Sequence, residues 1–161
     1  MTATTVKAIP EGMHTLTPHI ICADALGAFE FYKRAFGATE HCRLLTKDGK
    51  LMHAQLRIGD SVLMLMEQNL DWGAQGPTML GGSPVTIHVS VADVDAAFAR
   101  AVKEGGISKM PPADMFWGDR YGVLTDPYGH SWSIATHVRD MTADEMQTAI
   151  NQMNECADAV H

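Results

Sequence analysis

The chain has 161 residues, of which 46% are hydrophobic and 19% are charged, and its formal net charge is -7. This balance is typical of a globular protein, and the length suffices for one well-packed domain or for two small modules that share a core. Nucleic acid is excluded as the main partner, because phosphate binding needs a basic surface and the Lys and Arg residues form no cluster.

The first predicted module spans residues 14–67 and begins with a strand at 15–22. Asp24 can cap a helix that carries apolar residues at spacings of three and four and ends at Gly37. Strand candidates follow at 39–46, 51–58 and 61–66, joined by the turns Asp48-Gly49 and Gly59-Asp60. The predicted order is therefore strand, helix, strand, strand, strand.

Residues 68–84 are rich in Gly and Pro, show no period and are predicted to be a linker. The second module, residues 85–137, repeats the first: His19 and Asp24 recur 69 positions later as His88 and Asp93. Strand 85–92 and helix 93–105 lead to an edge segment at 110–116 and to strands 120–125 and 130–136. One extra residue in the second copy would change the offset to 70 near its end. The predicted fold class is α+β with two βαβββ modules.

The remaining segment, residues 138–161, is predicted to form an amphipathic C-terminal helix. Residues Thr142 to Glu145 fit a capping box. An apolar stripe follows, formed by Met146, Ala149, Ile150, Met153 and Ala157. We expect this helix to cover the sheet or to make a subunit contact.

The cysteine pattern and the lack of long apolar runs indicate the cellular compartment of the protein. Cys22, Cys42 and Cys156 are odd in number and irregularly spaced, which is typical of free thiols in a reducing compartment. No apolar run is long enough to cross a bilayer, and no secretion signal opens the chain. We therefore expect a cytoplasmic protein without a membrane partner.

The alternation of side chains along the strands predicts one apolar face, packed against helices, and one mixed face on each sheet. The mixed face would carry Thr17, His19, His53, Gln55, Arg57, Thr86, His88, Ser90, Tyr121, Thr125 and Ser133. If both mixed faces point inward, they line a cavity between the modules that suits a small-molecule ligand. The alternative is that these faces are simply exposed to solvent.

Two groups within this set have more specific candidate roles. His53 could bind a ligand or act as a general base, since neutral imidazole accepts a proton near pH 7; it could equally be a structural histidine. Trp117 and Tyr121 could form a stacking wall for a flat ligand, or could simply pack in the core.

Four sequence stretches, at residues 25–38 (ALGAFEFYKRAFGA), 52–65 (MHAQLRIGDSVLML), 116–122 (FWGDRYG) and 126–137 (DPYGHSWSIATH), carry a family resemblance. With the paired βαβββ plan, they make residues 14–140 resemble the vicinal oxygen chelate superfamily, and in particular its PhnB-like branch. That superfamily includes glyoxalase I, extradiol dioxygenases and bleomycin-resistance proteins. The resemblance implies a curved, open, barrel-like sheet, a small-molecule ligand and a homodimer.

Metal-dependent members of this superfamily use two His (or His and Gln) and two Glu as ligands. The resemblance places Thr17, Leu63, Thr86 and Ser133 at these four positions, and none of them is a usual ligand for a divalent ion. The expected function is therefore small-molecule binding without a cofactor. The alternative is a lyase or isomerase of glyoxalase type, or a dioxygenase, in which His19, His53 and His88 provide a base or a shifted site for a divalent metal ion.

Overall fold

The computed structural model describes residues 6–158, with side chains described to residue 153. Residues 1–5, and residues 159–161 of the predicted C-terminal segment, lie outside the described residues. Within residues 6–158, no helix is both long and apolar enough to span a membrane.

The first module contains β1 (His19–Cys22), α1 (Ala25–Phe36), β2 (Thr39–Leu45), β3 (Leu51–Ile58) and β4 (Ser61–Glu67). Its four-stranded sheet has the order β1-β4-β3-β2, in which only β1 and β4 pair in parallel.

The second module contains β5 (Thr86–Ser90), α3 (Val94–Lys103), β6 (Ile107–Asp114), β7 (Asp119–Thr125) and β8 (Ser131–His137). The order β5-β8-β7-β6 repeats that of the first sheet, so the predicted α+β fold with two βαβββ modules is confirmed. The two sheets stay separate and do not close into a barrel.

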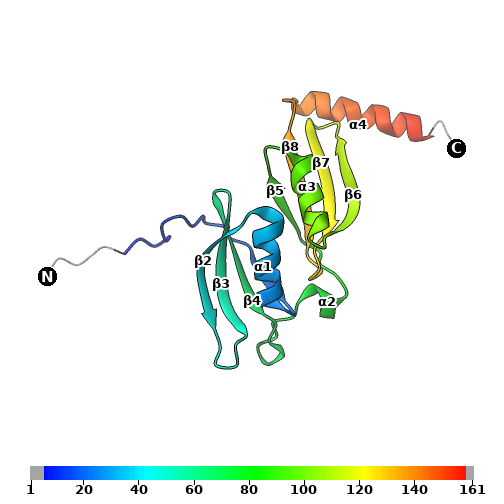
Figure 1. The fold of residues 1–161 in the computed structure, drawn as a ribbon. Helices are drawn as coiled ribbons and strands as arrows, with labels where there is room; N and C mark the ends of the chain where they lie inside the picture. The colour runs from blue at the N-terminus through cyan, green and yellow to red at the C-terminus, as the bar shows by residue number, and fades with distance from the viewer. Residues whose placement is uncertain (1–5, 159–161) are drawn as a thin grey trace.

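Figure 1 shows the modules side by side, with α1 and α3 adjacent. The helix-facing sides of both sheets contribute to one core cluster, which contains Phe29 and Tyr32 from the first module and Phe98 and Trp132 from the second. The segment between the modules, predicted as a linker without periodic structure, contains the short helices η1 (Leu70–Trp72) and α2 (Pro77–Leu80).

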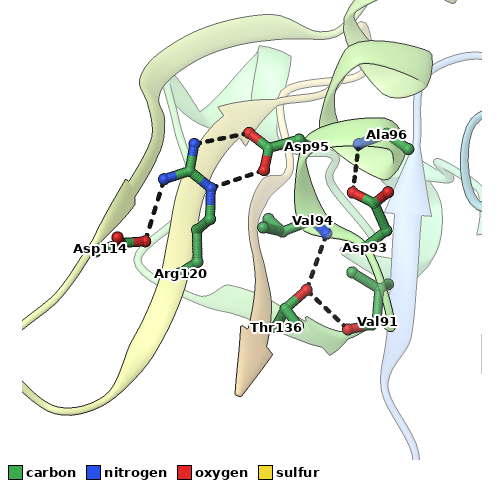
Figure 2. Close-up of polar contacts among 8 residues, drawn as sticks. All are labelled: Val91, Asp93, Val94, Asp95, Ala96, Asp114, Arg120 and Thr136. Atoms are coloured by element: carbon green, nitrogen blue, oxygen red, sulfur yellow. Dashed lines mark hydrogen bonds and ion pairs between the residues drawn. The ribbon is translucent and has the colours of Figure 1, made fainter. Parts of the chain in front are cut away.

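Both long module helices begin in the same way. The side chains of Asp24 and Asp93 each accept a hydrogen bond from a backbone N–H three residues later, at 3.0 Å, as the sequence predicted. A side chain at the end of the last strand accepts the N–H of the first helical residue: Glu67 that of Ala25 at 2.8 Å, and Thr136 that of Val94 at 2.9 Å. Figure 2 shows this arrangement at α3.

Arg120 adds a second anchor beside the start of α3. Its guanidinium donates two hydrogen bonds to Asp95, at 2.7 and 2.8 Å, and one to Asp114 at 3.1 Å (Figure 2). These bonds tie α3 to β7 and to the end of β6. Because β6 is an edge strand, it accommodates Pro111 and Pro112, whose missing N–H groups would interrupt an inner strand.

Asp126, in the turn between β7 and β8, joins the two modules inside the core. The residue is 1% exposed, and its Oδ2 accepts hydrogen bonds from the Tyr32 hydroxyl at 2.6 Å and the Trp132 indole at 2.8 Å. Its Oδ1 accepts the backbone N–H groups of Tyr128 and His130, each at 2.9 Å. Because Tyr32 lies on α1, the carboxylate holds the first helix against the second module.

The helix α4 (Ala143–Asp158) begins with the predicted capping box, in which Glu145 accepts the N–H of Thr142 at 2.7 Å. Along its stripe, Met146 and Ala149 are half-buried, but Ile150 and Met153 are 37% and 58% exposed. Figure 1 shows α4 lying across the end of the second module and projecting beyond it. Within one chain, the described part of the helix therefore leaves much of its stripe uncovered.

The strand register corrects one sequence-based alignment. His19 pairs with Met64 and His88 with Ser133, so the offset between the modules is 69 for both members of each pair. The offset of 70 that matched Leu63 with Ser133 is wrong. The β7–β8 turn does have one extra residue, but the stretch from helix cap to the next strand is one residue shorter in the second module. Leu63 instead pairs with Leu56 and is buried in the core.

Candidate functional site

The polar face of the first sheet brings together His19, His53, Gln55 and Arg57. The rings of His19 and His53 meet edge to face with centroids 5.8 Å apart, and Gln55 Nε2 lies 3.4 Å from His53 Nε2. Met64 pairs with both His19 and Gln55 and therefore lies between them on the same face. Sequence reasoning missed Met64, because only the register identifies it.

Two groups on this face have defined electrostatic surroundings. Partial burial, and then the neighbouring His53, lower the pKa of His19, which keeps its imidazole neutral and able to accept a proton or bind a metal near pH 7. Arg57 donates to the backbone carbonyls of Gly12 at 3.4 Å and Asp60 at 3.5 Å. Its guanidinium is thus partly engaged by the chain itself.

The polar face of the second sheet is organised around His88. Its Nδ1 lies 2.8 Å from the Ser133 hydroxyl, and its ring stacks on Tyr121 with centroids 6.1 Å apart. One row further along, the Thr86 hydroxyl donates to Ser131 at 3.1 Å. The alternation of β5 and β8 thus places hydroxyls, an imidazole and an aromatic ring on one surface.

Trp117 extends this surface. Its indole ring meets the Tyr121 ring edge to face, with ring centroids 5.5 Å apart. The indole Nε1–H donates a hydrogen bond to the Asp119 carboxylate at 3.0 Å. Asp119 also bonds His137 Nδ1 at 2.7 Å, while His137 Nε2 bonds Asp140 at 2.9 Å. The carboxylates of Asp140 and then Asp119 raise the pKa of His137. Sequence reasoning gave His137 no role, because its two partners lie 18 and 3 residues away in the chain and form no motif with it.

One chain does not enclose its two polar faces. His19, Thr86, His88 and Ser90 are exposed, while the opposite sides of both sheets share the core. Each polar face therefore points away from the shared core, and the described residues of a single chain do not form the expected cavity lined by both faces.

Thr17 lies outside the strand in which it was predicted. β1 begins at His19, and the Thr17 hydroxyl donates to the carbonyl of His14 at 3.3 Å. Proline at position 18 has no N–H to contribute to a strand ladder, which favours a strand start after it.

A cavity of about 540 Å³ lies where the modules meet. His14, Leu16 and Pro18, the β3–β4 turn and the free edge of β5 line it. Of the predicted ligand-binding residues, the lining includes His88. Arg100 lines the same cavity and donates to the carbonyl of Ala35 at 2.7 Å, which links α3 to α1.

Comparison with known proteins identifies the family. Residues 13–134 match the sequence profile of the Glyoxalase/Bleomycin resistance protein/Dioxygenase superfamily. The chain belongs to this superfamily.

The relatives of this glyoxalase-superfamily protein include the Mycobacterium bovis protein Mb0911c, which is 45% identical over 143 residues, 87% of this chain and 94% of that protein. A gene product of Arabidopsis thaliana, At5g48480, is similar in structure, with a TM-score of 0.60, 26% identity, and coverage of 76% and 96% of the two chains. The PhnB protein from Bacillus cereus has the same fold, with a TM-score of 0.60, 18% identity, and coverage of 76% and 99%.

The donor set of this superfamily member differs from the usual metal site. At the expected ligand positions stand the hydroxyls of Thr17, Thr86 and Ser133, and in place of Leu63 the register offers the thioether of Met64. Neutral hydroxyls and a thioether are poor replacements for imidazole and carboxylate around a divalent ion. Within residues 6–153, no group of three His, Cys, Asp or Glu could hold a metal, so His19, His53 and His88 do not form one site in a single chain.

Proposed function

We propose that this glyoxalase-superfamily protein binds a small molecule, part of it planar, on its polar sheet faces and without the superfamily's usual metal site. The observation that carries the proposal is the arrangement of His88, Ser133, Tyr121 and Trp117. It combines a directed hydrogen-bonding pair at 2.8 Å with a surface of aromatic rings. Such a combination fixes both the position and the orientation of a flat ligand. We also propose that the protein belongs to the PhnB-like branch of the superfamily. The sequences of residues 25–38, 52–65, 116–122 and 126–137 support this assignment.

We propose further that a second copy of the chain completes the site. In the part of the chain that the structure describes, both polar faces are open, and the outer edges of β1 and β5 carry no neighbouring strand in their sheets. A homodimer could place the first sheet of one copy against the second sheet of the other. The two polar faces would then enclose one site. Its side chains would be those of His19, His53, Gln55, Arg57, Thr86 and Thr17, together with His88, Ser133, Tyr121 and Trp117. Light scattering at micromolar concentration should give the mass of a dimer, and a monomer would contradict this part of the proposal.

Binding can be tested with a library of planar aromatic alcohols and carboxylic acids in a thermal-shift screen. At a hundredfold excess over the dissociation constant, a ligand stabilises the fold by about 2.7 kcal/mol. For a chain of this length, that free energy raises the melting temperature by roughly 5–10 °C.

The His88→Ala and Tyr121→Ala variants should lose this shift. His41→Ala, which changes an exposed histidine of β2, should keep it. A hit that stabilises all three variants equally binds elsewhere and would contradict the proposed site.

A second candidate function is a metal-dependent lyase or isomerase of glyoxalase type, or a dioxygenase. The observation that favours it is the pair of imidazoles His19 and His53, 5.8 Å apart between centroids, with the pKa of His19 lowered. In a dimer, His88 of a second copy could join them, and His53 could act as base.

Elemental analysis of protein purified without added metal separates the two functions. Stoichiometric metal that is lost in both His19→Ala and His53→Ala would support the enzyme and overturn metal-free binding. We also propose a cytoplasmic location, which the free thiols of Cys22 and Cys42 support.

A further inference from the structure

A cavity of about 530 Å³ lies at the end of the first sheet, between the hairpin turn of residues 46–50 and the loop after β4. Figure 1 shows both loops at the end of the first module that lies away from α4. The proposed ligand site on the polar sheet faces, called the polar-face site below, includes His19, His53, His88 and Trp117, and none of its residues lines this cavity.

The loop after β4 holds Trp72 at the rim of this cavity. Asn69 and Ala74 exchange backbone hydrogen bonds at 2.8 and 2.9 Å, which closes the loop into a compact bridge. Asn69 Oδ1 also accepts the N–H of Trp72 at 3.3 Å, and Gly73, with φ of 69°, ends the short helix η1. The loop thus fixes the backbone of Trp72, while the residue remains 65% exposed. An exposed aromatic side chain on a fixed backbone offers a ring face to a ligand at low entropic cost.

The charges around the cavity are mainly negative. Asp48, Glu67 and Asp71 line it, and Lys50 is the single basic residue in its lining. Glu67 uses one oxygen to accept the N–H of Ala25, but its charge remains at the cavity wall. At neutral pH, three carboxylates and one ammonium leave two negative charges in excess. This excess favours a cation over a neutral or anionic ligand.

The rest of the lining suits the body of such a ligand. Met52, which is 50% exposed, and Met66 provide flexible apolar surface. Gln68 also lines the cavity, and its Oε1 is the one buried side-chain oxygen or nitrogen in the described part of the chain that takes no hydrogen bond. A carbonyl oxygen in this state is matched by an N–H donor.

We propose that this cavity binds an organic cation, an ammonium or guanidinium group on an apolar body, with the cation over the ring of Trp72 and facing Asp71. The aromatic ring attracts the cation through its quadrupole, and the carboxylates add a longer-range attraction. The proposal does not depend on the polar-face site.

The test uses benzylamine, which is protonated at pH 7, and benzyl alcohol, its neutral counterpart of almost the same shape. The indole N–H signal of Trp72 in a two-dimensional NMR spectrum, assigned with Trp72→Phe, reports binding. Benzylamine should shift this signal saturably with a dissociation constant of about 1 mM, and benzyl alcohol should bind at least about tenfold more weakly. Added salt should weaken only benzylamine.

Variants separate the contributions, with backbone amides of residues 46–50 as the readout where Trp72 is changed. Trp72→Leu should lower the affinity for benzylamine about tenfold, while Trp72→Phe should keep most of it. Asp71→Asn should weaken binding several-fold, whereas the matched control Glu11→Gln, which removes one negative charge from the exposed N-terminal segment, should not.

Three results would overturn the proposal. The first is equal binding of benzyl alcohol and benzylamine. The second is unchanged affinity in Trp72→Leu. The third is no shift of the Trp72 signal at about 10 mM benzylamine, which is tenfold above the expected dissociation constant.

Discussion

Replacing Tyr32 by Phe should destabilise the protein by removing a single hydrogen bond that crosses between the modules. The Tyr32 hydroxyl donates to Asp126 at 2.6 Å in a fully buried setting. Burial and the adjacent carboxylate raise the pKa of Tyr32, so the hydroxyl stays protonated and remains a donor at all ordinary pH values. Phe keeps the ring, which packs against Phe31, Phe36 and Trp132.

The magnitude follows from the charge of the acceptor. A hydrogen bond to a charged group contributes about 1.5–3 kcal/mol, and Asp126 would keep its other three donors. Asp126→Asn should cost more, about 3–5 kcal/mol. The new amide would point a donor at the Trp132 indole, which can only donate, or at the two backbone N–H groups.

Urea unfolding followed by circular dichroism and tryptophan fluorescence measures these losses. With a slope of about 2 kcal/mol per molar urea, Tyr32→Phe should lower the midpoint by roughly 1 M. Tyr128→Phe is the matched control. It removes a tyrosine hydroxyl that takes no part in the bonds to Asp126, and it should change stability by less than about 0.5 kcal/mol.

The double variant tests the coupling between the two residues. If the hydroxyl acts through Asp126, the losses of Tyr32→Phe and Asp126→Asn should fall short of additivity by at least about 1 kcal/mol. Fully additive losses, or a Tyr32→Phe variant as stable as the control, would refute the reasoning.

Three further predictions concern other parts of the chain. The carboxylates of Asp140 and Asp119 raise the pKa of His137 above 6.5, so the stabilisation from its protonated form is complete below the unfolded value and is lost as pH rises through the folded value. His137→Gln should therefore lower the melting temperature at about pH 5.5 and change it little at about pH 8.5; an equal loss at both values would contradict this. Gly118 has φ of 101°, and a Cβ there would collide with the carbonyl of Arg139, so Gly118→Ala should cost about 2–4 kcal/mol in urea unfolding. Gly49→Ala, at φ of 83° in open space, is the control for backbone strain alone and should cost about 1 kcal/mol. Burial raises the pKa of the Cys22 thiol, so in a Cys42→Ser, Cys156→Ser background Cys22 should react with a disulfide reagent only when the protein unfolds; rapid reaction of the native protein would contradict it.

The duplicated fold could be predicted because its signals are local. Asp24 and Asp93 cap helices through bonds to residues only three positions away, and the hydrogen bonds of the Asp48-Gly49 turn lie within residues 46–50. The position of Met64 could not be predicted in the same way. A one-residue insertion and a one-residue deletion cancel between the modules, and only the pairing of His19 with Met64 reveals this. A one-residue error moves a side chain to the other face of a sheet, which is why Leu63 was misplaced.

The contacts that join the two modules could not be predicted from the sequence either. Tyr32 and Asp126 are 94 residues apart, and Asp126 belongs to a sequence, Asp126-Pro127-Tyr128-Gly129, that is typical of a turn. A turn aspartate is usually exposed, and nothing in the sequence distinguishes this buried one. The polar residues were assigned to the mixed faces from alternation alone, but alternation gives no information on which way each face points once two modules share one core.

The Asp126 contact makes the two halves of the duplicated chain unequal. By register, Ile58 occupies the position in the first module that Asp126 occupies in the second, and Ala101 on α3 stands where Tyr32 stands on α1. A chain built from two copies of the first module would have two such hydroxyls and no carboxylate to receive them. Two copies of the second would bury two carboxylates against alanine. The modules share one architecture but are no longer interchangeable, and each folds as the complement of the other.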